Sequence, residues 1–515
     1  MVAKGSILLL SSTYTLAARL LQEIKVVFTI ISNSPQRLPA ENKDARLPQS
    51  VTQEPPLQNK KFQRLADWLF VREFRGRHLL IRSFPFNVLE ISNEELVLIQ
   101  AWLRGGVPLP SALFGILSES HFLDPEPRPE EHLNEHTSAI LLVTTACNLR
   151  CSGCFASGGD YGLGVQHMTE TVIEATVRYL ADRITSLYRD RAFTGKSNLG
   201  VHFFGGEPFI AYDQMQHAVN CAEAMSLKLT RDCGAPVTPD FFVTTNGTLL
   251  RPERVRFLKE HGIAVLLSID GPAHDERRRF ASGRGSLARA IETFRTLRSE
   301  GISTRLNTVV LGEDIADFKT ILAWFKDEVY ANTPELTVYH TFSFQRDGPG
   351  SPLGECGTAY VPEQIDAYIG DLLDFNSHGY QLYETQLLQK LRSGGRFYKC
   401  SSGVKRIAVG PEGKVYPCQG FIDPAFEMGS ILDADFRHRT TPISERLARR
   451  NIATLLPCRN CVFSALCPHN VDCAARAHYT LGGMESIDVN GMCRVGFGLM
   501  DEILFEREGI WKSLK

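Results

Sequence analysis

One stretch of the chain decides its fold: Ala139-Ile-Leu-Leu-Val-Thr-Thr-Ala-Cys-Asn-Leu-Arg-Cys-Ser-Gly-Cys-Phe-Ala-Ser-Gly-Gly-Asp-Tyr-Gly162. Its first part contains an apolar run, residues 140–143, which predicts a short buried strand. The loop after this strand carries three cysteines, Cys147, Cys151 and Cys154, in the pattern C-x3-C-x2-C. We therefore expect the three thiols to lie together at one end of a strand.

Three thiols on one loop suit an iron–sulfur cluster that keeps one iron open. A cubane cluster normally takes four thiolates, so three cysteines leave one iron free to bind a small chelating ligand. S-adenosyl-L-methionine (SAM) offers such a chelate in its amino and carboxylate groups, and we predict catalytic and metal-binding roles for all three cysteines. The alternative is a structural zinc knuckle, which needs a fourth Cys or His at matching spacing. The next histidine, His167, lies well beyond Cys154.

Length and composition limit the classes of protein to be considered. A chain of 515 residues is long enough for two or three domains, and a net charge of -2 predicts no nucleic-acid partner. The clustering of its 13 cysteines favours metal sites over disulfides, which predicts a reducing, cytoplasmic location. No apolar run reaches the roughly 18 residues of a membrane span, so we expect no membrane partner.

Two segments precede the quoted stretch. Residues 1–60 are expected to form a poorly structured extension and linker, because their second half is rich in Pro, Asn, Gln and Ser. Residues 61–125 predict a small domain, with a hairpin within residues 71–91, a capping box at Ser92 and Glu95, and two helices. This order is similar to winged-helix peptide-recognition domains, which can add a peptide as an extra strand at a sheet edge. The alternative is a packing extension of the main domain.

Residues 138–345 alternate strands with helices, which predicts an α/β fold. Six such strands imply a parallel sheet curled as a partial (β/α)6 TIM-type barrel, with its chemistry at the carboxyl ends of the strands. The expected strands lie at residues 140–143, 201–204, 241–245, 264–269, 304–310 and 336–340. The expected helices lie near residues 170–187, 211–227, 251–261, 287–300 and 314–327.

Polar or glycine-rich turns follow three of these strands. The turn Gly205-Gly-Glu-Pro208 lets the backbone approach a ligand closely and offers a carboxylate to an ammonium group. Asn246 follows the next strand, and Ser268, Asp270 and Arg278 come with the strand after that. Each motif is weak by itself, because an ordinary turn explains the glycines and a solvated basic turn explains the arginine.

Together, the three cysteines and these turns resemble the radical SAM superfamily. The resemblance implies one [4Fe-4S] cluster on the cysteine loop, with SAM chelated to its open iron. It also implies that Glu207 meets the methionine amino group, Asp270 the ribose and Arg278 the methionine carboxylate. The cofactor-binding residues expected in this way are Gly205, Gly206, Glu207, Asn246, Ser268, Asp270 and Arg278. One departure is Gly153, which stands where the family usually has an aromatic residue near the adenine.

A second set of cysteines lies in the last part of the chain. Their order and most of their gaps resemble the SPASM extension of radical SAM peptide and protein maturases, which holds two auxiliary [4Fe-4S] clusters. The resemblance assigns an outer cluster to Cys458, Cys461, Cys467 and Cys493, and an inner cluster to Cys400, Cys418 and Cys473. The gap between Cys467 and Cys473 is longer than usual, so His469 stays an alternative ligand.

Residues 396–500 are the expected auxiliary-cluster domain, reached through connecting helices at residues 346–395 and followed by a tail at residues 501–515. The inner cluster has three clear ligands. Either another group completes it, or its open iron binds a substrate thiolate. The remaining cysteines are expected to be free thiols; they are Cys221, Cys233 and Cys356.

The resemblance implies an enzyme that generates a 5'-deoxyadenosyl radical and modifies a peptide or protein side chain. We expect a thioether cross-link first and a carbon–carbon link second, with a reductant such as flavodoxin or ferredoxin as partner. A sulfatase-type maturase, which forms formylglycine, is the main alternative; such enzymes place an acidic base where this chain has Gln419. The other alternative, a non-catalytic peptide-binding protein whose cysteines hold zinc, is disfavoured by the SAM-type turns.

Overall fold

The computed structural model describes most of the chain from Phe62 onward. The described residues are 62–74, 76–124, 137–190, 195–310, 312–330, 339–344, 362–375, 400–436, 441–467, 473–487 and 492–506. The expected N-terminal extension, Cys356 and the alternative ligand His469 lie outside these residues. So do most of the expected connecting segment and most of the expected tail.

A nine-stranded sheet forms the centre of the protein, with the strand order β12-β11-β9-β8-β7-β5-β13-β14-β15. From β5 to β12 each strand pairs in parallel with the next one along the chain. These strands are β5 (Ser138–Thr144), β7 (Ser197–Gly205), β8 (Val237–Thr245), β9 (Ala264–Ser268), β11 (Thr304–Val310) and β12 (Tyr339–Phe344). The α/β architecture with a parallel sheet, which the sequence predicts, is therefore confirmed.

The strands are apolar because the sheet is covered. In β5, every residue from Ala139 to Thr144 is buried, as is typical of a parallel strand with both faces packed. Burial alternates toward the carboxyl ends of β7 and β8, where His202, Phe204 and Thr244 are only partly buried. The Nε2 atom of His202 lies 2.8 Å from the hydroxyl of Thr244. The inner face of the sheet thus becomes polar and more open at the edge where the strands end.

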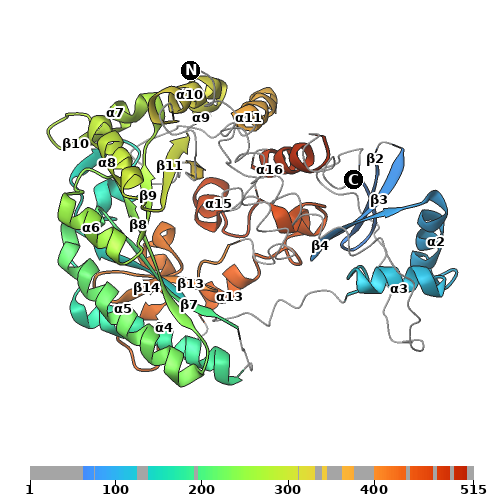
Figure 1. Ribbon diagram of the computed structural model, residues 1–515, viewed down its shortest axis with the longest axis horizontal. Coiled ribbons are helices and arrows are strands. Elements are labelled where there is room, and N and C mark those ends of the chain that lie inside the picture. The colour runs from blue at the N-terminus through green and yellow to red at the C-terminus, as the bar shows by residue number, and fades with distance from the viewer. Residues whose placement is uncertain are drawn as a thin grey trace, which may run out of the picture.

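Helices cover the outer face of this sheet (Figure 1). They are α4 (Glu170–Asp190), α5 (Tyr212–Cys233), α6 (Pro252–Glu260), α8 (Leu287–Ser299), α9 (Gly312–Ala316) and α10 (Phe318–Trp324), with a π-helical turn at Phe325–Tyr330. Helix α4 shows why they pack there. Its buried stripe, which includes Val172, Val177, Leu180 and Ile184, recurs at helical spacing and faces the core.

The C-terminal part of the chain extends the same sheet, which the sequence did not predict. Strand β13 (Arg406–Val409) pairs in parallel with β5, and Ile407 lies opposite Ala139. Strands β14 (Lys414–Tyr416) and β15 (Gly429–Ser430) continue the sheet in antiparallel order. A separate two-stranded ladder joins β6 (Leu149–Cys151) to β10 (Arg278–Phe280), and the short helix α7 (His274–Arg277) directly precedes β10.

Residues 62–119, called the N-terminal domain below, form a four-stranded antiparallel sheet with two helices. One set of its buried side chains packs with these helices, and the alternate set joins the main core. Its elements are β1 (Gln63–Ala66), β2 (Leu69–Phe74), β3 (Arg77–Ser83), β4 (Phe86–Ile91), α2 (Asn93–Leu103) and α3 (Ser111–Glu119). The capping box of Ser92 and Glu95 is confirmed. The expected hairpin corresponds to more than two strands, because Gly76 turns the chain at φ +76° and divides residues 71–82 between β2 and β3.

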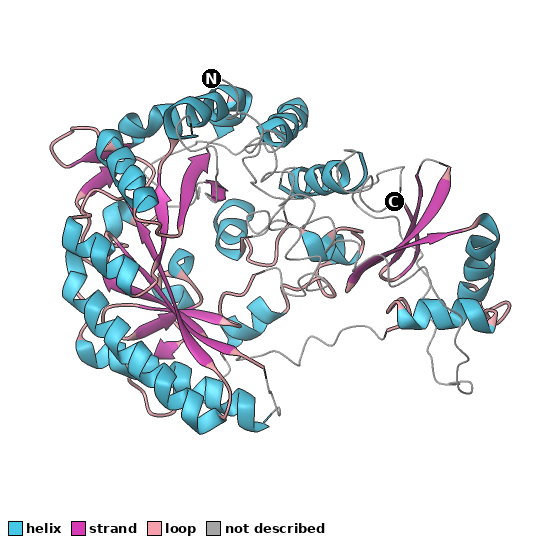
Figure 2. Ribbon diagram, viewed as in Figure 1, coloured by secondary structure: helices cyan, strands magenta, loops and turns pink. Residues whose placement is uncertain are grey.

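The described C-terminal elements lie between the main sheet and the N-terminal domain (Figures 1 and 2). They include α13 (Pro442–Ala448), α14 (Leu456–Arg459), α15 (Ala474–Leu481) and α16 (Met492–Asp501), followed by a π-helical turn at Glu502–Glu506. Helix α11 (Pro362–Phe375) contacts both α10 and α16. Among the helices of the described segments, none combines the length and the apolar character needed to cross a membrane.

Aromatic and charged side chains join the N-terminal domain to this C-terminal region. The ring of Phe62 packs edge-on against Phe463, with ring centroids 5.4 Å apart. Arg72 forms a buried ion pair with Asp501, and Asp67 pairs with Arg459. The three contacts link residues between 392 and 429 positions apart, so the C-terminal region packs against the first described domain.

Candidate active site

The cysteine loop is fixed by the small ladder outside the main sheet. Cys151 ends β6 and lies directly opposite Arg278 of β10. The backbone N–H of Ser152 donates to the carbonyl of Arg277 at 2.9 Å, and the thiol of Cys147 accepts from the N–H of Leu149 at 3.5 Å. The fold thus places Arg278, which follows β9 in the chain, next to Cys151, which follows β5.

Glycines allow this loop to pack on the turn after β7. The N–H of Glu207 donates to the carbonyl of Ala146 at 2.8 Å. A Cβ on Gly206 would lie 2.2 Å from the Ala146 carbonyl oxygen, and a Cβ on Gly205 would lie 2.1 Å from that of Thr144. Residues with a side chain cannot approach a backbone so closely, so the two glycines are required by the contact between the turn and the loop.

Glu207 lies beneath the loop and is 1% exposed. Its carboxylate accepts from the hydroxyl of Thr245 at 2.7 Å, from the N–H of Asn246 at 2.8 Å and from the N–H of Phe209 at 3.3 Å. Burial raises the pKa of Glu207 to about 7, although these hydrogen bonds oppose the shift. A carboxylate has about four acceptor positions, so the three donors leave room for one further donor, such as an ammonium group.

Asn246 connects the third strand to the cysteine loop. Its Nδ2 donates to Oδ1 of Asn148 at 3.0 Å, and Nδ2 of Asn148 in turn donates to the hydroxyl of Thr248 at 2.7 Å. The N–H of Thr248 donates back to Oδ1 of Asn246 at 2.9 Å. Asn246 therefore positions the residue that follows Cys147. Sequence reasoning missed Asn148 and Thr248, because their partners become neighbours only when the strands assemble.

Asp270 and Arg278, which the resemblance assigned to different parts of SAM, form an ion pair. Nε of Arg278 lies 2.5 Å from one carboxylate oxygen of Asp270, and Nη2 lies 3.1 Å from the other. Burial disfavours both charges, but their pairing prevails and lowers the pKa of Asp270 while raising that of Arg278. Asp270 also accepts from the N–H of Val309 at 3.0 Å. This pairing holds the guanidinium beside Cys151, whose thiol also accepts a hydrogen bond from Arg278.

His274 connects both members of this ion pair through hydrogen bonds. The N–H of Asp270 donates to Nδ1 of His274 at 3.2 Å, and Nε2 of His274 lies 3.0 Å from the hydroxyl of Ser286. That hydroxyl donates to the carbonyl of Arg278 at 2.7 Å. Burial, followed by Arg278, lowers the pKa of His274 to about 4, so the ring is neutral and Nε2 carries the hydrogen. Ser268, the remaining expected contact, is buried at the end of β9.

The three thiols form a donor set that fits a cluster. Burial, followed by the nearby Glu207, raises the pKa of Cys147 to about 12. Burial also raises the pKa of Cys151, although Arg278 opposes the shift. Each of the two thiols also feels the charge of Cys154, so the three sulfurs share one site. Three clustered soft sulfur donors suit iron.

The four cysteines assigned to an outer cluster surround one small cavity. Its walls include Cys458, Cys461, Cys467 and Cys493. Phe463 and Phe497 complete the lining on the apolar side. The four thiols come from two helices and the segment between them, and the cavity supplies the number of sulfur donors that a fully ligated cluster takes.

The three cysteines assigned to an inner cluster are also neighbours. Burial, followed by the proximity of Cys400 and Cys473, raises the pKa of Cys418 to about 12. The thiol of Cys418 accepts from the N–H of Gly420 at 3.3 Å. Next to it, Oε1 of Gln419 is buried and has no hydrogen-bond partner among the described residues. The site therefore contains three sulfur donors and an unused amide acceptor.

Aromatic side chains connect this inner set with the cysteine loop. Phe155, directly after Cys154, lies with its ring centroid 6.1 Å from Tyr161 and 6.2 Å from Phe204. Tyr161 and Phe204 pack against the apolar group of residues that contains Cys418. The inner face of the sheet is thus continuous from the cysteine loop to the C-terminal cysteines.

The chain is similar to known proteins over the region that contains this site. Residues 141–325 match the radical SAM superfamily. The cysteine-type anaerobic sulfatase-maturating enzyme of Clostridium novyi is 21% identical over 340 residues, which cover 63% of this chain and 84% of that enzyme. The radical SAM cyclopropyl synthase TigE of Paramaledivibacter caminithermalis is 22% identical over 298 residues, which cover 56% of this chain and 58% of TigE.

A solved structure, native anSMEcpe with bound AdoMet, has the same fold with a TM-score of 0.55 at 18% identity. The alignment covers 73% of this chain and 99% of that chain. The matched residues 141–325 include the cysteine loop, the glycine turn and the Asp270–Arg278 pair. In this region, the chain is similar to the radical SAM superfamily.

Proposed function

We propose that this protein is a radical SAM enzyme that modifies a side chain of a peptide or protein. The observation that carries the proposal is the junction of three elements: the cysteine loop packs on the Glu207 turn and lies opposite Arg278. Cys147, Cys151 and Cys154 would hold a [4Fe-4S] cluster. The open acceptor position of Glu207 and the guanidinium of Arg278 would hold the amino and carboxylate groups of SAM.

When bound, SAM and the clusters supply one-electron chemistry, which removes hydrogen from a substrate carbon and takes up the surplus electron. The protein's own residues bind and orient. The Asp270–Arg278 pair fixes a positive charge where a carboxylate would lie, and its partner His274 stays neutral. Phe155, Tyr161 and Phe204 form an apolar wall beside the thiols, which would limit access of water to a radical.

Peptide modification is supported by the two outer parts of the molecule. We propose that the six parallel strands form a partial (β/α)6 barrel, and that residues 61–125 are a winged-helix-like domain that recognises a peptide at a sheet edge. The C-terminal cysteines would hold two auxiliary clusters. We further propose a reducing, cytoplasmic setting with flavodoxin or ferredoxin as reductant, because the ten cysteines in metal-type spacing need protection from oxidation.

A cross-link, with a thioether before a carbon–carbon bond, is the product that we favour. Formylglycine formation is the second candidate, and the sulfatase-maturating relative of which this chain covers 84% supports it. The residue after Cys418 argues against it. Sulfatase-type maturases are expected to carry an acidic base at the position of Gln419. The amide of Gln419 cannot take up a proton as a carboxylate does.

The first test is SAM cleavage by anaerobically reconstituted protein. Three cubane clusters need about 12 irons per chain, and reduced protein should release 5'-deoxyadenosine. Cys151→Ala should abolish the release, whereas Cys233→Ala, at the outer end of α5, should not change it. Cleavage that persists in Cys151→Ala would contradict the proposed site.

The second test separates the two products by mass spectrometry. The substrates are a cysteine-containing peptide encoded beside this gene and a cysteine-containing peptide from a sulfatase. A cross-link removes two hydrogens and, if it is a thioether, also removes the free thiol. Formylglycine instead creates an aldehyde that reacts with hydroxylamine. An aldehyde on either peptide would replace the cross-link proposal by the second candidate.

A further inference from the structure

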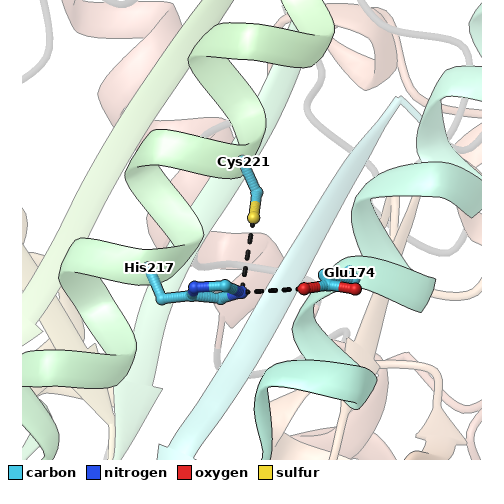
Figure 3. Close-up of side chains that lie close together, drawn as sticks. All are labelled: Glu174, His217 and Cys221. Carbon is cyan, nitrogen blue, oxygen red and sulfur yellow. Dashed lines mark hydrogen bonds and ion pairs between the residues drawn. The ribbon is translucent and has the colours of Figure 1, made fainter.

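Outside the sheet, four side chains of α4 and α5 come together. Glu170 and Glu174 lie one turn apart on α4, and His217 and Cys221 lie one turn apart on α5. Residues at this spacing share one face of a helix, and the two helices are neighbours. Figure 3 shows that Glu174, His217 and Cys221 point toward one another across the gap between the helices.

Nε2 of His217 is the centre of this group. It lies 3.3 Å from a carboxylate oxygen of Glu174 and 3.4 Å from the thiol sulfur of Cys221. The three atoms all lie within 4.8 Å of one another. One hydrogen on Nε2 cannot point along both directions, and a bare Nε2 cannot donate to the carboxylate. Nε2 of His217 can therefore form a good hydrogen bond with either Glu174 or Cys221, but not with both at once.

A metal ion accounts for both contacts. With zinc–ligand bonds of about 2.0 to 2.3 Å, a tetrahedral site separates neighbouring ligand atoms by about 3.3 to 3.6 Å. The two measured distances from Nε2 fit such edges. Imidazole nitrogen, thiolate sulfur and carboxylate oxygen are all zinc ligands, and a thiolate disfavours magnesium and calcium.

Glu170 adds a second feature of such sites. Its carboxylate oxygen lies 4.0 Å from Nδ1 of His217, on the side of the ring away from Glu174 and Cys221. Histidines that bind metals commonly direct the other ring nitrogen to a carboxylate, which fixes the ring.

We propose that Glu174, His217 and Cys221 bind a zinc-type divalent cation between α4 and α5, with Glu170 orienting His217 and water as the fourth ligand. The site is separate from the cysteine loop and from both C-terminal sets, and it gives Cys221 a role other than the free thiol that the sequence predicts. Glu174 is about half exposed, so the ion reaches the site from solvent. Its effect is to cross-link two helices on the outer face of the sheet.

The test uses the full chain with its clusters reconstituted, freed of zinc and then dialysed against Zn²⁺. Wild-type protein should bind one zinc ion more than His217→Gln and Cys221→Ser. Replacing an outer partner of a ligand weakens metal binding by about 10- to 100-fold, so Glu170→Gln should fall in this range and the two ligand variants beyond it. Zinc-edge X-ray absorption of the extra ion should show one sulfur neighbour among nitrogen and oxygen.

His261→Gln is the matched control. His261 also pairs with a glutamate, Glu223, at 2.8 Å between two helices, but no thiol joins them in the group. This control should bind zinc as the wild type does, and all variants should cleave SAM at the wild-type rate. Equal zinc content in wild type and His217→Gln, or an extra ion with only sulfur neighbours, would overturn the proposal.

Discussion

The cysteine loop and the C-terminal cysteines reach their positions in opposite ways. Cys147, Cys151 and Cys154 lie on one short loop, held by backbone hydrogen bonds to the glycine turn and to β10. The cavity that contains Cys458 and Cys493 is lined by residues between 457 and 497, and the N-terminal domain packs on its outer side through Phe62. The first site is therefore held by backbone hydrogen bonds to neighbouring strands and turns. The second packs against side chains from the other end of the chain.

The largest expected effect breaks the local site alone. In Gly206→Ala, the new Cβ would lie 2.2 Å from the carbonyl oxygen of Ala146, so the cysteine loop must move. SAM cleavage should be lost, and iron should fall by about four atoms of the twelve per chain, with the C-terminal iron kept. Iron analysis and 5'-deoxyadenosine release measure this.

Gly370→Ala is the control for that change. Gly370 lies in α11, and a Cβ there meets nothing within 4 Å. It should keep full iron content and activity, because alanine is the better helix former. If Gly206→Ala instead lost all its iron, the two cysteine sets would not be independent and the comparison would fail.

The next largest effect is expected from disrupting the contact between the N-terminal domain and the C-terminal region. Asp67 is 6% exposed and pairs with both Arg64 and Arg459, and Arg459 lies between Cys458 and Cys461. Asp67→Asn removes the buried negative charge that both arginines contact, although Arg64 keeps its hydrogen bond to Asn460. This loss should lower the free energy of unfolding by about 3 kcal/mol. Urea unfolding followed by tryptophan fluorescence measures the loss, and the C-terminal iron should become labile while SAM cleavage persists.

Glu90→Gln is the matched control for Asp67→Asn. The Arg77–Glu90 pair of the same domain is more than half exposed at 2.8 Å, so its loss should cost less than about 1 kcal/mol. Equal losses for the two variants would show that the contact with Arg459 does not support the C-terminal region.

Glu207 should make the free energy of unfolding depend on pH. The folded pKa of Glu207 is raised to about 7 from its usual 4.5, so the folded state keeps a proton that the unfolded state has lost. Stability from this group is therefore present below about pH 4.5 and falls as pH rises to about 7, by about 3 kcal/mol. Glu207→Gln, without bound SAM, should lack this decline. Parallel stability curves for the two proteins would contradict the assignment.

The smallest effect concerns the arginine opposite Cys151. Arg278→Lys loses the two-pronged contact with Asp270, since an ammonium cannot reproduce the fork of a guanidinium. The affinity for SAM should fall by about 10- to 100-fold, measured by isothermal titration. Arg279→Lys, whose side chain binds only the carbonyl of Asp275 and is exposed, should bind SAM as the wild type does. An unchanged affinity in Arg278→Lys would remove Arg278 from the SAM site.

The sequence predicts the strands and helices of the main sheet because apolar periodicity and turn residues are local signals. Five strands overlap expected ranges, namely β5, β7, β8, β9 and β11, and α2 begins at the expected capping box. The short strands β6 and β10 were not expected. The pairing of Arg278 with Asp270 was not predicted, because spacing does not tell whether two charged side chains face a ligand or each other. Asn148 and Ser286 were missed for the same reason.

The pairing of the C-terminal region with the main sheet could not be predicted from the sequence either. Residues 406–409 read as an ordinary apolar run, and nothing in them identifies β5 as their partner. The ion pairs of Arg64, Asp67 and Arg72 lie in strands or turns where arginine and aspartate are usual surface residues. Their burial follows from the C-terminal residues that cover them.

The pairing of β13 with β5 has a consequence for the synthesis of the chain. Ribosomes release the N-terminal part first, so one edge of β5 stays open until residues 406–409 have emerged. An open edge is a template for pairing with other chains. Asp67 likewise lacks its ion pair with Arg459 until residue 459 has been synthesised. Both early domains therefore mature only when the last part of the chain arrives, and a nascent chain stalled before that point would expose its most apolar strand to its neighbours.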